Sequence, residues 1–313
     1  MLPKRLQLCT LLALVVFLTS CINVQIDGRE DLATTETTTQ EDLVLTSVGP
    51  IYSITSALVE RTGIVVLNMP ERARSLAAQP TWMAKQSEPF YETFAQADAV
   101  VSMGNLWKYD FFYLTVREQN IHVVNIDATL PYSSQLTGVS VVNSPSNGEA
   151  SPYFWLSPAN IIRSVKIISN DLARIFPESA AVIRANEQKI SAELLAQKKD
   201  FEVALVDTDP YIYALTDEFS YLTTEYGIYV EDYFVKQDIN WTEEDLAQLT
   251  ATLKDGGIPI VIHKWEPSDA IQAAIETGGS TLMVLNTFET STADLNTIAT
   301  ENLTKLISAL LTL

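Results

Sequence analysis

The sequence at residues 178–202 reads ESAAVIRANEQKISAELLAQKKDFE and contains neither Pro nor Gly. Small and aliphatic side chains alternate with charged ones along it, which predicts one uninterrupted amphipathic helix. At 1.5 Å per residue this helix is roughly 37 Å long, enough to cross a small domain. Pro177 separates it from another predicted helix at 158–176. The long helix therefore predicts a connection between two parts of the chain.

Short apolar runs alternate with amphipathic segments on both sides of this helix. The runs predict strands at 43–47, 63–68, 99–102, 121–126, 210–214, 228–233, 258–263 and 281–285. Helices are predicted at 51–61, 90–97, 111–119, 219–225, 242–254, 268–277 and 294–311. Strands separated by helices are typical of parallel βα units. The predicted fold class is α/β, with two lobes, each a mostly parallel sheet flanked by helices, joined by one long helix.

The first residues are typical of a bacterial lipoprotein signal peptide. Lys4 and Arg5 give a positive start, and the apolar run at 6–18 is too short to span a bilayer. The run ends in Leu-Thr-Ser-Cys at 18–21, where small residues precede a cysteine. This pattern predicts cleavage after residue 20 and lipid attachment to Cys21. The alternative is a plain secretory signal in which the cysteine stands by chance.

The domain boundaries follow from these segments. We expect a signal peptide at 1–20, a lipidated cysteine with a flexible, acidic, Thr-rich tether at 21–42, an N-terminal lobe at 43–177, a linking helix at 178–203 and a C-terminal lobe at 204–313. No later segment is long and apolar enough to cross a membrane. The expected location is extracytoplasmic, with the lipid holding a monomer on the periplasmic side or at the cell surface.

Composition excludes two classes of function. The formal net charge of −19 repels nucleic acid. The chain has two histidines, and Cys21 is the only cysteine that remains once Cys9 leaves with the signal peptide. It contains no Gly-rich phosphate loop and no G-x-S-x-G motif, so the residues for the usual pairs of nucleophile and base are missing. We therefore expect a binding protein without catalytic residues.

Several phrases in the chain resemble those of the zinc and manganese solute-binding lipoproteins of ABC importers. They are ADAVV at 97–101 followed by Gly104-Asn105, VVNI at 123–126, SPYFWLSPAN at 151–160 and FSYLTTEYG at 219–227. They occur in the family's order between residue 43 and the C-terminus. The resemblance implies two lobes joined by a backbone helix, a ligand cleft between the lobes, and delivery of zinc or manganese to an importer permease.

The resemblance also implies four metal-ligand positions, which the family fills with histidines and carboxylates. In this chain they fall on Trp82, on Tyr153, on Thr216 or Asp217, and on Asn286. Indole does not ligate metals, and phenol and carboxamide are poor zinc ligands at neutral pH. Asp217 is the one carboxylate among them, so we expect the metal site to be lost or replaced.

The two histidines do not restore the metal site. His122 lies in the predicted strand at 121–126, where a structural position is expected. His263 ends the predicted strand at 258–263, and α/β lobes place their ligands at such ends. Lys264 then puts a positive charge where related proteins often carry a glutamate. Asp217 and His263 are weak metal candidates, and zinc or manganese is possible from the resemblance but disfavoured.

Aromatic residues suggest another use of the cleft. Trp82 and Tyr153 are predicted to face it, with Trp107 and Trp265 on nearby turns. Aromatic faces beside a carboxylate such as Asp217 form a box for an organic cation or a planar ring. The alternative, equally weighted, is that Trp82 and Trp107 pack under loops.

Three functions therefore stay open: an importer's solute-binding lipoprotein with metal-derived specificity, the same fold binding an organic solute, and a surface lipoprotein that acts through adhesion. The expected partners are an importer permease, a small solute and, through the lipid, a membrane. The predicted ligand-binding residues are Trp82, Trp107, Tyr153, Thr216, Asp217, His263, Lys264 and Asn286.

Overall fold

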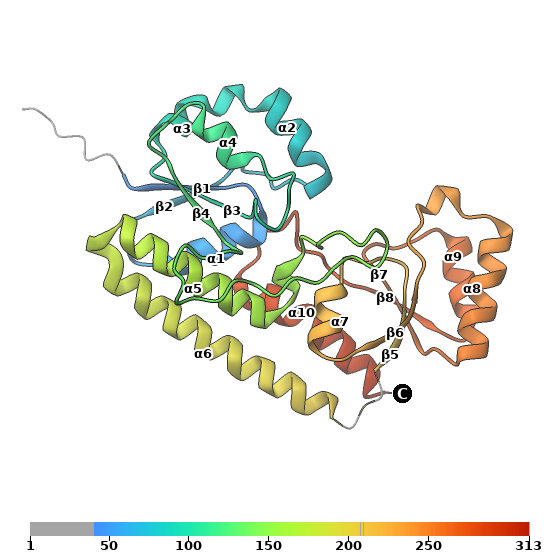
Figure 1. Cartoon of the computed structure of the whole chain (residues 1–313). Helices are drawn as coiled ribbons and strands as arrows, with labels where there is room; N and C mark the ends of the chain where they lie inside the picture. The colour runs from blue at the N-terminus through green and yellow to red at the C-terminus, as the bar shows by residue number, and fades with distance from the viewer. Residues whose placement is uncertain (1–40, 207, 209, 313) are drawn as a thin grey trace, which may run out of the picture. The chain divides into compact units, whose positions relative to one another are not determined.

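Parallel strands form two four-stranded sheets in the computed structural model, which describes residues 41–206, 208 and 210–312. The first sheet has the order β2 (Val65–Asn68), β1 (Leu43–Thr46), β3 (Ala99–Ser102), β4 (Val124–Asp127) (Figure 1). The second has the order β6 (Tyr229–Tyr233), β5 (Tyr211–Ala214), β7 (Ile260–His263), β8 (Thr281–Val284). All paired strands are parallel, which confirms the two-lobed α/β prediction. The predicted signal peptide, Cys21 and nearly all of the tether lie outside the described residues.

Side chains of successive strand residues enter different cores, as the period of two requires. In the first sheet, Val44 and Val101 belong to a large apolar cluster that continues into the second lobe, the shared cluster. Leu45 belongs to a separate cluster, the outer cluster of the first lobe. In the second sheet, Ile212 belongs to the same large cluster and Tyr213 to a third cluster. Each sheet is therefore apolar on both faces, as parallel sheets covered by helices are.

Helices cover both faces of each sheet. One face of the first sheet, on the side of the shared cluster, is covered by α1 (Gly49–Leu58) and α5 (Pro158–Ile175) (Figure 1). The other face is covered by α2 (Gln79–Gln86), α3 (Tyr91–Gln96) and α4 (Phe112–Arg117). On the second sheet, α7 (Ser220–Glu225) and α10 (Leu295–Leu310) contribute to the shared cluster, and α8 (Glu243–Gly256) and α9 (Asp269–Thr277) cover the outer face. The shared cluster thus joins the two lobes.

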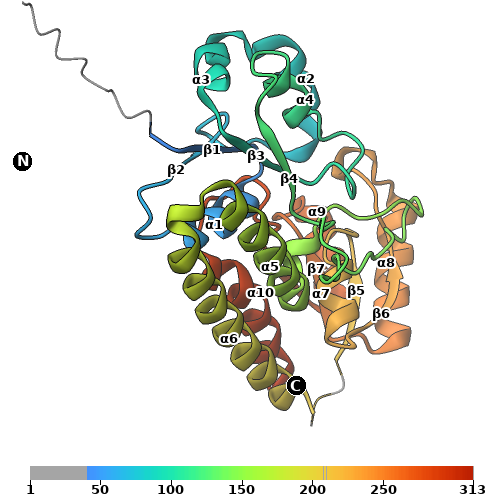
Figure 2. The same ribbon diagram turned by 60° about the vertical axis from the view of Figure 1, so that its left-hand side comes forward.

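The predicted long helix is confirmed as α6 (Ala180–Leu205), which is 26 residues long. It begins after a short 3₁₀ turn at Pro177–Ser179 and packs against α5 and α10 (Figure 2). Ile183 and Leu194 of α6 are buried in the shared cluster. The last helix, α10, also contacts α1, so the end of the chain packs against its first βα unit.

Two local predictions are wrong. The strand predicted at 121–126 begins only at Val124, and His122 lies in an exposed turn in which its backbone N–H donates to Asn120 Oδ1 at 3.0 Å. The short helix α2 was not predicted, because its polar residues and Pro80 hide the helical pattern. None of the described helices is long and apolar enough to cross a membrane.

Candidate functional site

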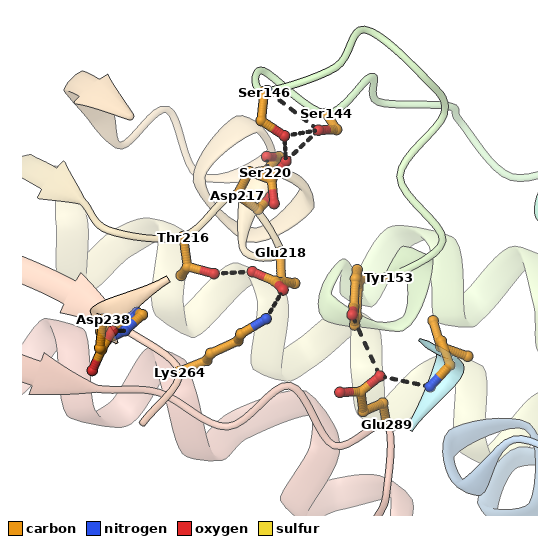
Figure 3. Close-up of polar contacts among 12 residues, drawn as sticks. Ser144, Ser146, Tyr153, Thr216, Asp217, Glu218, Ser220, Asp238, Lys264 and Glu289 are labelled. Atoms are coloured by element: carbon orange, nitrogen blue, oxygen red, sulfur yellow. Dashed lines mark hydrogen bonds and ion pairs between the residues drawn. The ribbon is translucent and has the colours of Figure 1, made fainter. Parts of the chain in front are cut away.

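The second sheet presents a run of polar residues where its two central strands end. Thr216, Asp217 and Glu218 follow β5, while His263 is the last residue of β7 and Lys264 comes next. Carboxyl ends of neighbouring parallel strands meet at the same edge of a sheet, where α/β lobes hold ligands. The turn into α7 separates the two adjacent carboxylates, so that Asp217 and Glu218 have different partners (Figure 3).

Glu218 and Lys264 form an ion pair at this edge. Lys264 Nζ donates to Glu218 Oε1, and Thr216 Oγ1 donates to Oε2 (Figure 3). The side chains are 24% exposed for Lys264 and 10% for Glu218. Burial raises the pKa of Glu218, and the Lys264 ammonium acts in the opposite direction. A cation that belongs to the protein therefore neutralises the most buried carboxylate of the site.

A second carboxylate, Glu289, joins separate segments of the chain. Its Oε2 accepts hydrogen bonds from the backbone N–H of Leu76 at 3.0 Å and from the hydroxyl of Tyr153 at 3.4 Å (Figure 3). Burial raises the pKa of Tyr153, and so do the nearby charges of Glu289, Glu218 and Asp217. Tyr153 is therefore a neutral phenol at physiological pH, which is a poor metal ligand.

Asp217 is held by the loop that precedes Tyr153. Ser144 Oγ and Ser146 Oγ both donate to Asp217 Oδ2 (Figure 3). Asp217 and Tyr153 also line a cavity of about 500 Å³. Trp107, from the turn after β3, lines the same cavity. The structure thus brings together three of the residues predicted for the cleft.

Two other predicted residues lie elsewhere. Trp82 is on α2, is 3% exposed and packs 5.6 Å from Phe90 in the outer cluster of the first lobe, so it does not share the cavity with Tyr153. Asn286 does not line the cavity either: its side-chain Oδ1 accepts a hydrogen bond from the backbone N–H of Phe288 at 2.8 Å, and its backbone pairs with the side chain of Asn302. The prediction that both side chains converge with Tyr153 and Asp217 is corrected by these contacts.

His263 is buried near the Glu218–Lys264 pair, but in a different environment. It is 2% exposed, its ring lies 4.6 Å from that of Trp265, and its Nε2 is 3.8 Å from Asp238 Oδ1. Burial lowers its pKa, and Asp238 acts against that effect. Its Nδ1 has no hydrogen-bond partner among the described residues. Across 41–206, 208 and 210–312, no group of three or more His, Cys, Asp or Glu side chains is placed to hold a metal ion.

Sequence reasoning missed Glu218, Glu289, Ser144 and Ser146. Glu218 adjoins the predicted Asp217, and its position four residues beyond the end of β5 was the available signal. Glu289 lies five residues beyond the end of β8 in an irregular segment, where periodicity gives no orientation. The serines lie in the 131–150 loop, which has one isolated bridge, Asn143–Ala150, and no helix or strand.

Comparisons with known proteins agree with the two-lobed fold. The family model described as "ZnuA: Zinc-uptake complex component A periplasmic" matches residues 44–309. The structure is similar to Zn(II)-bound AdcA from Streptococcus pneumoniae, with a TM-score of 0.67 and 18% identity over 86% of this chain. The chain spans 58% of the length of that protein. A comparison with curated proteins gives no match.

Two further solved structures cover nearly whole proteins or domains. One is the Zn(II)-bound ZnuA-like domain of the same AdcA, with a TM-score of 0.65, 19% identity and coverage of 86% of this chain and 99% of the domain. The other is the solute-binding protein FpvC from Pseudomonas aeruginosa in complex with Mn²⁺, with a TM-score of 0.67, 18% identity and coverage of 87% and 99%. At these identities the likeness establishes a common fold.

Proposed function

This chain belongs to the family described as zinc-uptake complex component A, periplasmic, and from that membership we propose that it is the extracytoplasmic solute-binding lipoprotein of an ABC importer whose site no longer holds a divalent metal. In this proposal Cys21 carries the lipid, a monomer captures a small solute, and the importer permease receives it. The protein catalyses no reaction. Mass spectrometry of the membrane-extracted protein tests the anchor, which requires a lipid mass on Cys21.

The ion pair between Lys264 and Glu218 is the observation that carries the loss of the metal. The similar AdcA and FpvC structures contain Zn(II) and Mn²⁺. Borderline divalent ions need several imidazole or carboxylate ligands around one point. Here Glu218 is neutralised by Lys264, and Thr216 or Asp217 takes the position that the resemblance gives to a histidine. A metal ion brought to Glu218 would have to displace an ammonium that is covalently part of the chain.

An organic molecule is the solute that we propose in place of a metal, because Asp217, Tyr153 and Trp107 share a cavity of small-molecule size, about 500 Å³. The third hypothesis, a surface lipoprotein that acts through adhesion, would gain from a filled cleft. The open cavity therefore supports solute binding over adhesion.

Metal titration tests the proposal directly. Protein purified without chelator should contain no stoichiometric zinc or manganese, and calorimetry should detect no site of sub-micromolar affinity. Thr216→His combined with Lys264→Gln should gain zinc affinity, since it adds an imidazole beside a carboxylate that has lost its counter-charge. Thr312→His with Lys305→Gln, at exposed positions of the C-terminal segment, controls for the added histidine. Stoichiometric zinc bound tightly by the natural sequence would overturn the proposal.

A further inference from the structure

The cavity beside Asp217 is built from three separate segments. The turn after β3 contributes Leu106 to Tyr109, the loop before α5 contributes residues between Ser144 and Tyr153, and Asp217 comes from the end of β5. Its volume of about 500 Å³ falls in the range of small-molecule sites. It is distinct from the Glu218–Lys264 pair, since neither residue of the pair lines it.

Three aromatic residues, Trp107, Tyr109 and Tyr153, line the cavity. Trp107 and Tyr109 are in edge contact with centroids 6.4 Å apart, and Tyr153 lines the cavity while packing 5.5 Å from Trp155. Lys108 Nζ lies 5.1 Å from the centroid of the Tyr109 ring. An ammonium group therefore already uses one of these rings, at a distance typical of cation–π contact.

The charges of the wall leave one carboxylate without a counter-charge. Lys108 pairs with Glu149 at 2.6 Å, so these two residues cancel. Asp217 forms no ion pair with any described residue, and its Oδ2 accepts hydrogen bonds from Ser144 and Ser146. The cavity thus combines a net negative charge with apolar aromatic faces.

We propose that this cavity binds a small organic cation of the substituted-ammonium class, with the cation against the Trp107 and Tyr153 rings and its charge balanced by Asp217. This inference rests on the proposed function and names its solute class. Aromatic faces attract a large, weakly hydrated ammonium through cation–π contacts and offer no lone pairs to a divalent metal. A single unpaired carboxylate matches a single positive charge.

Calorimetry with matched probes tests the proposal. The probes are choline and its neutral isostere 3,3-dimethylbutan-1-ol, which replaces the quaternary nitrogen by carbon. Choline should bind at least tenfold more tightly than the isostere. Asp217→Asn should remove most of this preference, and Trp107→Leu should weaken choline at least tenfold. Lys108→Gln should strengthen choline binding, because it removes a competing positive charge from the wall of the cavity. Tyr132→Leu, an exposed aromatic outside this cavity, should have no effect.

The outcomes separate the solute class from the function. Equal affinity for the two probes, or unchanged choline binding in Asp217→Asn, overturns the cation assignment. Absence of choline binding in chelator-treated protein also overturns the cation assignment. If zinc fails to bind to that preparation as well, the proposed function as a metal-free importer component still stands. Tight zinc binding by the same preparation would instead refute the proposed function.

Discussion

Replacement of Lys264 by Met removes the ammonium that neutralises Glu218 while it keeps a side chain of similar length. Removal of one partner from a fully buried ion pair costs about 3–5 kcal/mol, whereas exposed pairs contribute about 0–1 kcal/mol. Here Glu218 is 10% exposed and Lys264 is 24% exposed. Because both side chains are mostly buried, the cost of removing Lys264 should lie nearer the value for a buried pair. Partial exposure of Lys264 to solvent lowers that cost somewhat. We expect Lys264→Met to lower the free energy of unfolding by about 2–3 kcal/mol at neutral pH.

The loss should depend on pH in a defined direction. Burial already raises the pKa of Glu218, and Lys264 opposes that rise. Without Lys264, the folded-state pKa of this carboxyl rises further above its unfolded value. A group with a raised folded pKa stabilises the protein as it takes up its proton, so the variant should recover part of the loss as pH falls from 7.5 to 5.5.

Urea unfolding followed by circular dichroism at these two pH values measures both effects. Lys305→Met is the control, because Lys305 pairs with Glu301 at 2.8 Å on the surface, with side chains 45% and 33% exposed. It should cost less than about 0.5 kcal/mol at either pH. Glu218→Gln together with Lys264→Met should regain most of the stability, because no buried charge remains. A loss below about 0.5 kcal/mol for Lys264→Met at pH 7.5 would refute the reasoning.

Two further predictions concern other buried positions. Burial lowers the pKa of His263, and Lys264 adds to this effect while Asp238 opposes it. As pH falls below about 6.5, His263 therefore takes up a proton in the unfolded chain before it does in the folded protein, which lowers the free energy of unfolding. His263→Gln should remove this loss, which is at most about 1.4 kcal/mol per pH unit. The same change of urea midpoint with pH in both proteins would contradict this. A Cβ at Gly49 would lie 2.0 Å from the carbonyl oxygen of Ser291, so Gly49→Ala should cost about 2 kcal/mol or more in urea unfolding. Gly104→Ala, whose Cβ would lie 3.8 Å from its nearest neighbour, should be tolerated, and equal losses for the two glycines would remove the steric explanation.

The fold was predictable because its signals are long and periodic. The helix at 178–202 and the eight apolar runs depend on patterns of several residues, which survive local irregularity. The errors occur where a short segment has a mixed pattern. His122 lies two residues after Asn120, whose side-chain Oδ1 accepts a hydrogen bond from the His122 backbone N–H in a turn ahead of β4. A β-branched run of six residues does not reveal that turn.

The site was predictable only in part, for a geometric reason. Tyr153, Asp217 and Trp107 follow well-marked strands or a well-marked loop, and they converge on one cavity. Trp82 was assigned through the family resemblance, in a segment where the 3₁₀ turn Leu76–Ala78 leads directly into α2. A resemblance of short phrases does not give the direction of a side chain after such a turn. Instead, Trp82 packs into the outer cluster.

The packing of α10 also governs when the protein can finish folding. Leu303 and Leu306 of this last helix are 1% and 0% exposed, and they share one cluster with Val44 and Ile51 of the first βα unit. The chain is synthesised from its N-terminus at about 5–20 residues per second, so roughly 10–50 s separate the appearance of these two parts. During that time the apolar face that awaits α10 stays uncovered. The shared cluster can therefore close only after α10 has been synthesised.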